Sequence, residues 1–200
     1  MRFAESVNEA IAILETIPHP AFNAKHARGV ADLCLNISSF YDVDREILET
    51  AAWWHDTGRI DGTKNHEFLS ASLAYENLAL HGFNKEECRK VHDTILTHRT
   101  TGFPRTIEGR ILKDADKLDL VSVERWMQVL DSKNRGIIID LSEMRNMVKI
   151  IPKMRNGILQ LEKSKEIFDQ MITPLLDYLS SSRDSELRRY FDELIHRALL

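Results

Sequence analysis

The amino-acid sequence predicts an all-α protein, and three observations favour this fold class. Only 8 glycines and 5 prolines occur among the 200 residues, so few positions interrupt a helix. Residues that favour helices are abundant, namely Leu, Ile, Ala, Glu, Lys and Arg. Apolar residues recur at spacings of three and four along much of the chain, which is the period of an amphipathic helix. With 43% hydrophobic residues, the chain can bury one substantial core.

The pattern of apolar stripes and breakers gives the expected helices in order. A first helix ends before Pro18, Asp44 is expected to cap the third, and Asn84 the fifth. Glycines mark the ends of the third and fourth helices. A sixth, long helix is expected from Thr106 until Asn134-Arg135-Gly136 breaks it. The expected ranges are about 2–16, 22–41, 45–57, 66–80, 84–99 and 106–132.

The last third of the chain, about 137–200, is expected to hold two or three amphipathic helices. Divisions are predicted near Pro152, near Pro174 and at the polar turn 180–184. This region contains no residue pattern that suggests chemistry, and it can serve as packing, lid or homo-oligomer surface. We expect one domain over 1–200, with a core of about 20–133, because repeats and long linkers are absent from the sequence.

Composition narrows the expected location and partners. The formal net charge of −4 gives no basic surface for wrapping nucleic acid. Cys34 and Cys88 fall at apolar helical positions, so reduced, buried thiols are expected. The first residues carry Glu5 and Glu9 in place of a basic leader, and no stretch approaches a membrane span, so a cytoplasmic protein is expected.

Histidines and aspartates fall on helix faces that should point toward the core. His26 shares a stripe with Val30 and Ile37, while His55 and Asp56 follow apolar residues at spacings of four. Asp116 has the same relation to its apolar neighbours in the long helix. Any one of them could be a core histidine or one side of a salt bridge between helices. Together they predict a divalent cation, because an ionised buried carboxylate must be paired, hydrogen-bonded or metal-bound.

The mixed nitrogen and oxygen donors limit the kind of metal. Imidazole and carboxylate suit Fe, Mn, Co, Ni or Zn better than the oxygen cages that bind Ca, and Mg is also compatible. Two cysteines are too few for a thiolate site.

The order of these residues resembles a known family. A His on one helix, an alanine-rich helix ending in His-Asp (AAWWHDTGR) and a later LKDADKLD are similar to the HD superfamily of metal-dependent phosphohydrolases. The resemblance covers about 22–125. It implies an HD-type helical bundle in which His26, His55, Asp56 and Asp116 coordinate one metal.

Two further segments resemble family members with two metals. NHEFLSASLAYENL contains His66 and Glu67, and ILTHRTTG contains His98. With His66 and His98 added, the pattern could hold a binuclear pair bridged by Asp56. The alternative is that these histidines only cap helices or support the ligands of a single ion.

The expected activity is hydrolysis of a phosphate ester or anhydride, with a nucleotide or another small phosphorylated metabolite as substrate. Asp56 is expected to orient the attacking water, and Glu67 to act as base or water-orienting group, or else only to complement a helix dipole. Cations near the expected site are the candidates for binding the substrate, namely Arg59, Lys64, Arg99 and Lys117. Two alternatives remain at this point: a di-iron oxygenase of the HD type, and a metal-stabilised regulatory domain without turnover.

Overall fold

The computed structural model describes residues 2–17, 19, 22–62, 65–137 and 141–198, and within these ranges all regular elements are helical. The all-α prediction is therefore confirmed. The α-helices are α1 (Arg2–Glu15), α2 (Ala24–Ser38), α3 (Arg45–Trp54), α4 (His66–Leu80), α5 (Lys85–Leu96), α6 (Ile107–Leu118), α7 (Val123–Asn134), α8 (Ser142–Lys153), α9 (Glu162–Ser181) and α10 (Ser185–Ala198). Short 3-10 turns are η1 (Thr57–Asp61) and η2 (Asp119–Val121), and η3 (Met154–Ile158) is a π-helix.

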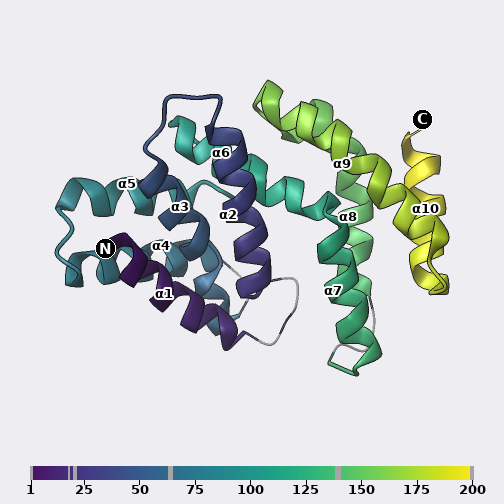
Figure 1. The fold of residues 1–200 in the computed structure, drawn as a ribbon, viewed down its shortest axis with the longest axis horizontal. Coiled ribbons are helices and arrows are strands. Elements are labelled where there is room, and N and C mark those ends of the chain that lie inside the picture. Colours follow the sequence, from purple (N-terminus) through teal and green to yellow (C-terminus); the bar gives the residue numbers. More distant parts are fainter. Residues whose placement is uncertain (1, 18, 20–21, 63–64, 138–140, 199–200) are drawn as a thin grey trace.

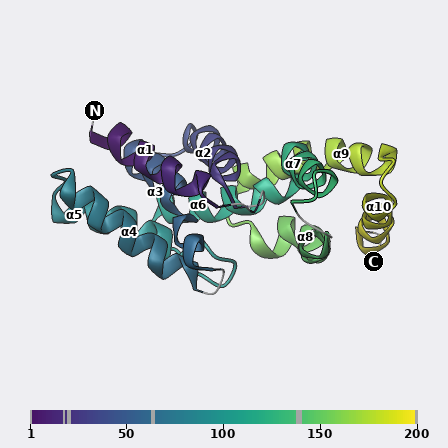
Figure 2. The same ribbon diagram turned by 90° about the horizontal axis from the view of Figure 1, so that it is seen from below.

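The helices form two groups that lie side by side along the long axis of the molecule (Figure 1). Helices α1 to α5 pack together in the first group, and α7 to α10 make up the second. Helix α6 runs between the groups and contacts both α2 and α9 (Figure 2). No helix in the described ranges combines the length and apolar character that a membrane crossing requires.

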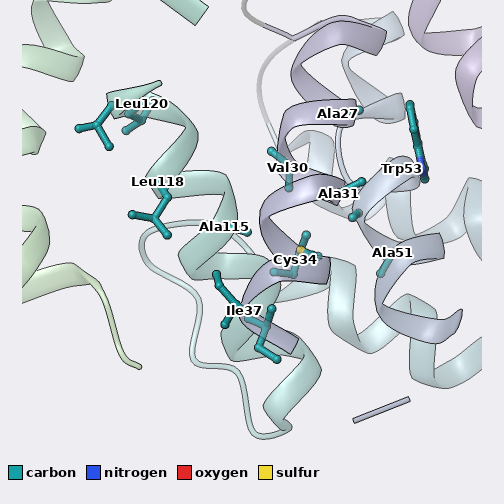
Figure 3. Close-up of a cluster of buried hydrophobic side chains, with 14 of the residues drawn as sticks. Ala27, Val30, Ala31, Cys34, Ile37, Ala51, Trp53, Ala115, Leu118 and Leu120 are labelled. Carbon is teal, nitrogen blue, oxygen red and sulfur yellow. The ribbon is translucent and has the colours of Figure 1, made fainter. Parts of the chain in front are cut away.

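Helix α2 lies between α3 and α6 in the core of the first group (Figure 3). Its small side chains Ala27, Ala31 and Cys34 are buried, which allows the neighbouring backbones to approach closely. Cys34 and Cys88 are both buried and free, as predicted. This close packing carries one face of α2, and with it His26, toward the end of α3.

Most helices begin where the sequence places a cap. The Asp44 carboxylate accepts a hydrogen bond from the backbone N–H of Ile47, and Asn84 forms a capping box with Glu87. Both caps were predicted. The ends differ from the expected ranges by a few residues: α2 spans 24–38, α3 ends at Trp54 and α5 ends at Leu96.

The predicted long helix over 106–132 is wrong. It divides into α6, η2 and α7, and Ser122 begins the last of these. The Ser122 hydroxyl accepts a hydrogen bond from the backbone N–H of Arg125, so a new helix starts there with a cap of its own. The break turns the chain from the first helix group into the second.

The predicted division at Pro174 is also wrong, because α9 continues through it. A proline removes the hydrogen bond to the carbonyl four residues earlier, which belongs to Gln170. Both Pro174 and Gln170 are exposed, so water can satisfy that carbonyl and the helix persists. The division at 180–184 is confirmed, since α9 ends at Ser181 and α10 begins at Ser185. The division expected near Pro152 lies further on, because Pro152 is inside α8 and the π-helix η3 continues the helical chain to Ile158.

Candidate metal centre

Six side chains that the sequence singled out meet at one place in the first helix group. They come from α2, the end of α3, the start of α4, the turn after α5, and α6. Five are buried, and the side chain of Asp116 is 13% exposed. The six residues are His26, His55, Asp56, His66, His98 and Asp116.

The first cluster consists of His26, His55, Asp56 and Asp116. The Nε2 atoms of the two histidines lie 3.2 Å apart. Asp56 Oδ2 lies 3.5 Å from His26 Nε2 and 3.8 Å from His55 Nε2. Asp116 Oδ1 lies 3.5 Å and 3.9 Å from the same two nitrogens. Two nitrogens and two carboxylate oxygens therefore converge on one small volume.

The second cluster uses the other oxygen of Asp56. Asp56 Oδ1 lies 3.0 Å from His66 Nε2 and 3.8 Å from His98 Nε2. The two histidine nitrogens are 3.2 Å apart. Donor atoms of His26, His55 and Asp56 in the first cluster are spaced to hold a metal ion, and so are those of the second cluster. Asp56 is shared, with one oxygen directed to each cluster.

Backbone carbonyls orient two of the histidines. His55 Nδ1 lies 2.6 Å from the carbonyl oxygen of Ala52, and His98 Nδ1 lies 2.6 Å from that of Ile95. A carbonyl only accepts, so each Nδ1 carries the proton and each neutral ring turns an Nε2 lone pair inward. Burial lowers the pKa of His55, and burial with the nearby His55 lowers that of His98 to about 3. Both rings are therefore neutral nitrogen donors.

Asp56 fits a metal more closely than it fits a hydrogen-bond network. Neither of its buried oxygens accepts a hydrogen bond in favourable geometry from the described residues, although Arg59 forms an ion pair with Oδ2. Burial raises its pKa, but His55, His26, His66 and the Arg59 guanidinium outweigh burial and hold the pKa well below its usual range. A buried, ionised carboxylate beside inward lone pairs needs positive charge. This donor set suits a divalent transition metal.

His26 is oriented by side chains that the sequence analysis missed. Its Nδ1 lies 2.7 Å from Asp119 Oδ2, and Arg125 Nη1 lies 2.6 Å from the same oxygen. Burial and Arg125 lower the pKa of His26, but the carboxylates of Asp119 and Asp116 outweigh them and raise it to about 10. The ring thus lies in a strongly negative environment that favours a cation at Nε2. Asp119 follows Asp116 by three residues, a helical spacing that could have revealed it.

A pocket of about 240 Å³ opens beside the second cluster. Three of the predicted cations line it, namely Arg59, Arg99 and Lys117. His66, His98 and Asp116 also line the pocket, together with Thr100 and Thr101, two hydroxyl-bearing residues of the loop after α5 that were not among the predicted site residues. The fourth predicted cation, Lys64, lies outside the described residues.

The cations around the pocket are held by carboxylates. Arg59 Nε lies 2.7 Å from Asp56 Oδ2, and its guanidinium lies over the ring of Phe22 at 3.8 Å. Lys117 Nζ lies 2.6 Å from Asp116 Oδ2. Two of the three positive groups that face the pocket, Arg59 and Lys117, therefore touch carboxylates that form the clusters.

Glu67 is buried and pairs with Arg99 at the side of the pocket. Its Oε2 lies 3.9 Å from His66 Nδ1, and its Oε1 lies 2.9 Å from Arg99 Nη1. The residue expected to act as a base thus contacts a residue expected to bind substrate. His92 is 30% exposed and pairs with Asp93.

Comparison with known proteins agrees with this geometry. Residues 23–120 match the family model described as HD domain. The chain is 29% identical over 149 residues to the uncharacterized protein YpgQ of Bacillus subtilis (strain 168), covering 70% of this chain and 72% of YpgQ.

Solved structures share the fold. The crystal structure of a predicted HD superfamily hydrolase from an uncultured Thermotogales bacterium has a TM-score of 0.67 and 20% identity, with 88% of each chain covered. Bacillus subtilis YpgQ in complex with ADP has a TM-score of 0.62 and 22% identity, covering 86% of this chain and 93% of that one. The family match, the common fold and the ordered histidine and aspartate pattern together identify residues 23–120 as an HD domain of the HD superfamily.

Proposed function

We propose that this protein hydrolyses a phosphate ester or anhydride of a small metabolite, with a nucleotide as the first candidate, using two divalent metal ions. The observation that carries the proposal is the division of Asp56, whose Oδ2 faces His26 and His55 while its Oδ1 faces His66 and His98. A carboxylate with a different pair of histidines at each oxygen is suited to bridge two ions.

The proposed ligands of one ion are His26, His55, Asp56 and Asp116, and those of the other are Asp56, His66 and His98. When bound, such ions neutralise phosphoryl charge and lower the pKa of water toward neutrality. The metals we propose are Fe, Mn, Co, Ni or Zn, and Mg is compatible.

The pocket beside the second cluster is proposed to take the phosphoryl end of the substrate. Arg59, Arg99 and Lys117 bring three positive groups to it, and Thr100 and Thr101 add hydroxyl donors. Its volume of about 240 Å³ is smaller than that of sites that enclose a whole drug-sized ligand, which hold roughly 300–1,000 Å³. We therefore expect the rest of the substrate to lie outside it, against the loop after α5. The ADP complex of the similar protein YpgQ favours a nucleotide.

Different side chains of this site are proposed to bind the substrate and to orient the attacking water. Arg99 and Lys117 hold the phosphoryl oxygens, and Asp56 orients the attacking water from the side of the clusters. Glu67 is proposed to accept a proton from that water or to orient it. Lys64 remains a proposed substrate contact on sequence grounds alone. A cytoplasmic location, a single domain over 1–200 and the possibility of a homo-oligomer likewise stay predictions.

Activity on a substrate panel tests the proposal. The chain is incubated with nucleoside mono-, di- and triphosphates and with generic phosphate esters, each with Mn²⁺, Co²⁺, Ni²⁺, Mg²⁺ or Zn²⁺, and released phosphate and pyrophosphate are measured. We expect turnover that Asp56→Ala abolishes while the circular dichroism spectrum is unchanged. Bound metal without turnover on any substrate would favour a regulatory domain. Two irons with oxygen consumption and no phosphate release would favour the di-iron oxygenase.

A further inference from the structure

The ring of His26 lies between two carboxylates of one chain segment. Asp116 Oδ1 lies 3.5 Å from Nε2 on the inner edge. Asp119 Oδ2 lies 2.7 Å from Nδ1 on the outer edge. The two aspartates are three residues apart, across the end of α6 and the start of η2. One helical turn therefore contacts both nitrogens of the same ring.

Arg125 extends this arrangement outward. Its Nη1 lies 2.6 Å from Asp119 Oδ2 and 2.8 Å from His26 Nδ1. Nδ1 thus lies within hydrogen-bond distance of a donor, Arg125, and of an acceptor, Asp119. The contact to Asp119 is the shorter of the two, at 2.7 Å, and a carboxylate only accepts, so Asp119 Oδ2 can take the Nδ1 proton while it also accepts from Arg125. The Asp119 and Arg125 side chains are each 5% exposed, so water competes little with these contacts. With Nδ1 directed to Asp119, Nε2 is the nitrogen that faces the cluster and that can bind a metal ion.

The support of His26 differs from that of two other histidines in the centre. His55 and His98 are each oriented by the carbonyl of a residue three positions earlier, Ala52 and Ile95. His26 depends on a side chain that arrives from another element, η2. The orientation of His26 can therefore be changed by substitution without altering the local backbone of α2.

We propose that Asp119 and Arg125 are positioning residues that fix the tautomer and the angle of His26 for the first of the two ions. This inference rests on the proposed function, because it presupposes that His26 binds a metal. Neither residue touches the second cluster, so loss of either one should weaken the ion at His26 selectively.

A cavity on the outer edge of His26 makes this role testable by chemical rescue. It has a volume of about 370 Å³ and is lined by His26, Gly29, Asp119 and Arg125 among others. A small carboxylate such as formate can enter a space of this size. In Asp119→Ala, formate could bind Arg125 and accept the Nδ1 proton in place of the missing carboxylate.

Gly29 offers a second way to disturb Asp119 without removing its charge. A Cβ at position 29 would lie 2.9 Å from Asp119 Oδ1, so an alanine there should shift the carboxylate. Asp32 provides a matched control, because it lines the same cavity but is exposed and belongs to neither cluster. Asp32→Ala therefore removes a carboxylate from the cavity without touching His26.

The experiment measures Mn²⁺ stoichiometry and affinity by calorimetry, with Co²⁺ absorption spectra as a second readout. Outer carboxylates of metal-binding histidines typically contribute about 10- to 100-fold in affinity. We expect Asp119→Ala to weaken one of the two ions by a factor in this range and to leave the other unchanged. Formate should restore the lost affinity and the Co²⁺ spectrum. Wild type and Asp32→Ala should show neither the loss nor a response to formate.

The possible results separate the two proposals. Wild type that binds no divalent ion contradicts the proposed function before any substitution is made. Asp119→Ala with wild-type affinity for every bound ion overturns the positioning role, and so does a loss of affinity that formate does not reverse. If Asp119→Ala fails to fold, Gly29→Ala and Arg125→Met decide: selective weakening of one ion, partly recovered in Arg125→Lys, supports the proposal, and unchanged affinity overturns it.

Discussion

The carboxylate of Glu67 lies against the guanidinium of Arg99, with Oε1 2.9 Å and Oε2 3.2 Å from Nη1. The Glu67 side chain is 10% exposed, whereas that of Arg99 is 42% exposed and borders the pocket. Glu67 can therefore act directly on water, or it can act by holding Arg99 toward a phosphoryl group. These two roles predict different kinetics.

Glu67→Gln distinguishes them, because glutamine keeps an acceptor for Arg99 but is a poor base. If Glu67 removes a proton, kcat should fall by about 10²- to 10⁴-fold with little change in KM. Steady-state kinetics on the best substrate of the panel measure this. The companion variant Arg99→Met should mainly raise KM. A Glu67→Gln enzyme with normal kcat and raised KM would contradict the role as base.

The division of donor atoms at Asp56 predicts how many ions each variant binds. Asp56→Ala should lose both ions, because each cluster loses an oxygen at once. His98→Ala should lose only the ion of the second cluster. His92→Ala is the matched control, since this histidine pairs with Asp93 away from both clusters. Metal analysis of the purified variants measures the stoichiometry. Retention of both ions in His98→Ala would contradict the two-ion site.

Helical periodicity was enough to find four of the candidate ligands but not the residues that orient them. His26, His55, Asp56 and Asp116 could be predicted because a polar residue on an apolar stripe is visible in the sequence. Arg125 could not, because its burial depends on the register of α7, which Ser122 restarts. A single hydroxyl cap decided that break, while the surrounding pattern favoured a continuous helix.

The side chains that the loop after α5 adds to the pocket were harder to predict than the loop itself. Thr100 and Thr101 follow the end of α5, and their positions depend on tertiary packing. Pro174 gave the opposite error: an interior proline usually ends a helix, but its position on the exposed side of α9 removes most of the cost. Local sequence rules therefore fail where tertiary packing or solvent exposure decides the position of a residue.

Gly58 lies in η1, the turn between the two clusters, and a substitution there tests how closely this turn packs against α4. A Cβ at this position would overlap the carbonyl oxygen of His66 and lie 2.7 Å from the backbone nitrogen of Ser70. Gly58→Ala should therefore push η1 away from α4 and lower the free energy of unfolding by about 1 to 3 kcal/mol. Gly157→Ala is the control, because nothing lies within 4 Å of its added Cβ. Urea unfolding measures both, and equal stability would contradict the close contact.

Lys133 predicts the pH dependence of the contact between α7 and α10. Its Nζ lies 3.0 Å from Glu186 Oε2 and 3.3 Å from Asp184 Oδ2. Hydrogen bonding to Glu186 raises the pKa of Lys133. Burial raises the pKa of Asp184, but bonds from the Leu187 N–H and from Lys133 outweigh it and lower that pKa.

The directions of the two pKa shifts determine the pH range in which this contact stabilises the fold. Because the pKa of Lys133 is raised in the fold, its stabilisation is fully present below the unfolded value of 10.5. That stabilisation is lost as pH rises through the folded pKa. Because the pKa of Asp184 is lowered in the fold, its stabilisation is fully present above the unfolded value of 3.8. That stabilisation is lost as pH falls through the folded pKa. Lys133→Met should therefore cost up to about 1 kcal/mol near neutrality. The difference from wild type should shrink in strong acid and strong base, which urea unfolding across pH measures; a constant difference would contradict it.

Asp114 joins the two helix groups through buried hydrogen bonds. It is fully buried on α6, and its carboxylate accepts from the backbone N–H groups of Gln160, at 3.0 Å, and of Leu161, at 2.9 Å, just before α9. Removing the carboxylate in Asp114→Ala leaves these donors without their acceptor. Each such buried group costs about 1 to 3 kcal/mol, so a large loss of stability is expected.

The helices that lose stability in Asp114→Ala show whether the chain unfolds as one unit. Asp114→Asn should be milder, because its amide oxygen still accepts one bond. Wild type should show a single urea transition by fluorescence and by circular dichroism, and Asp114→Ala should show faster amide hydrogen exchange in α9 than in α4. Equal acceleration in both helices would mean that Asp114 supports the whole fold and does not specifically connect the groups. Two separate transitions in the wild type would contradict the prediction of one domain over 1–200.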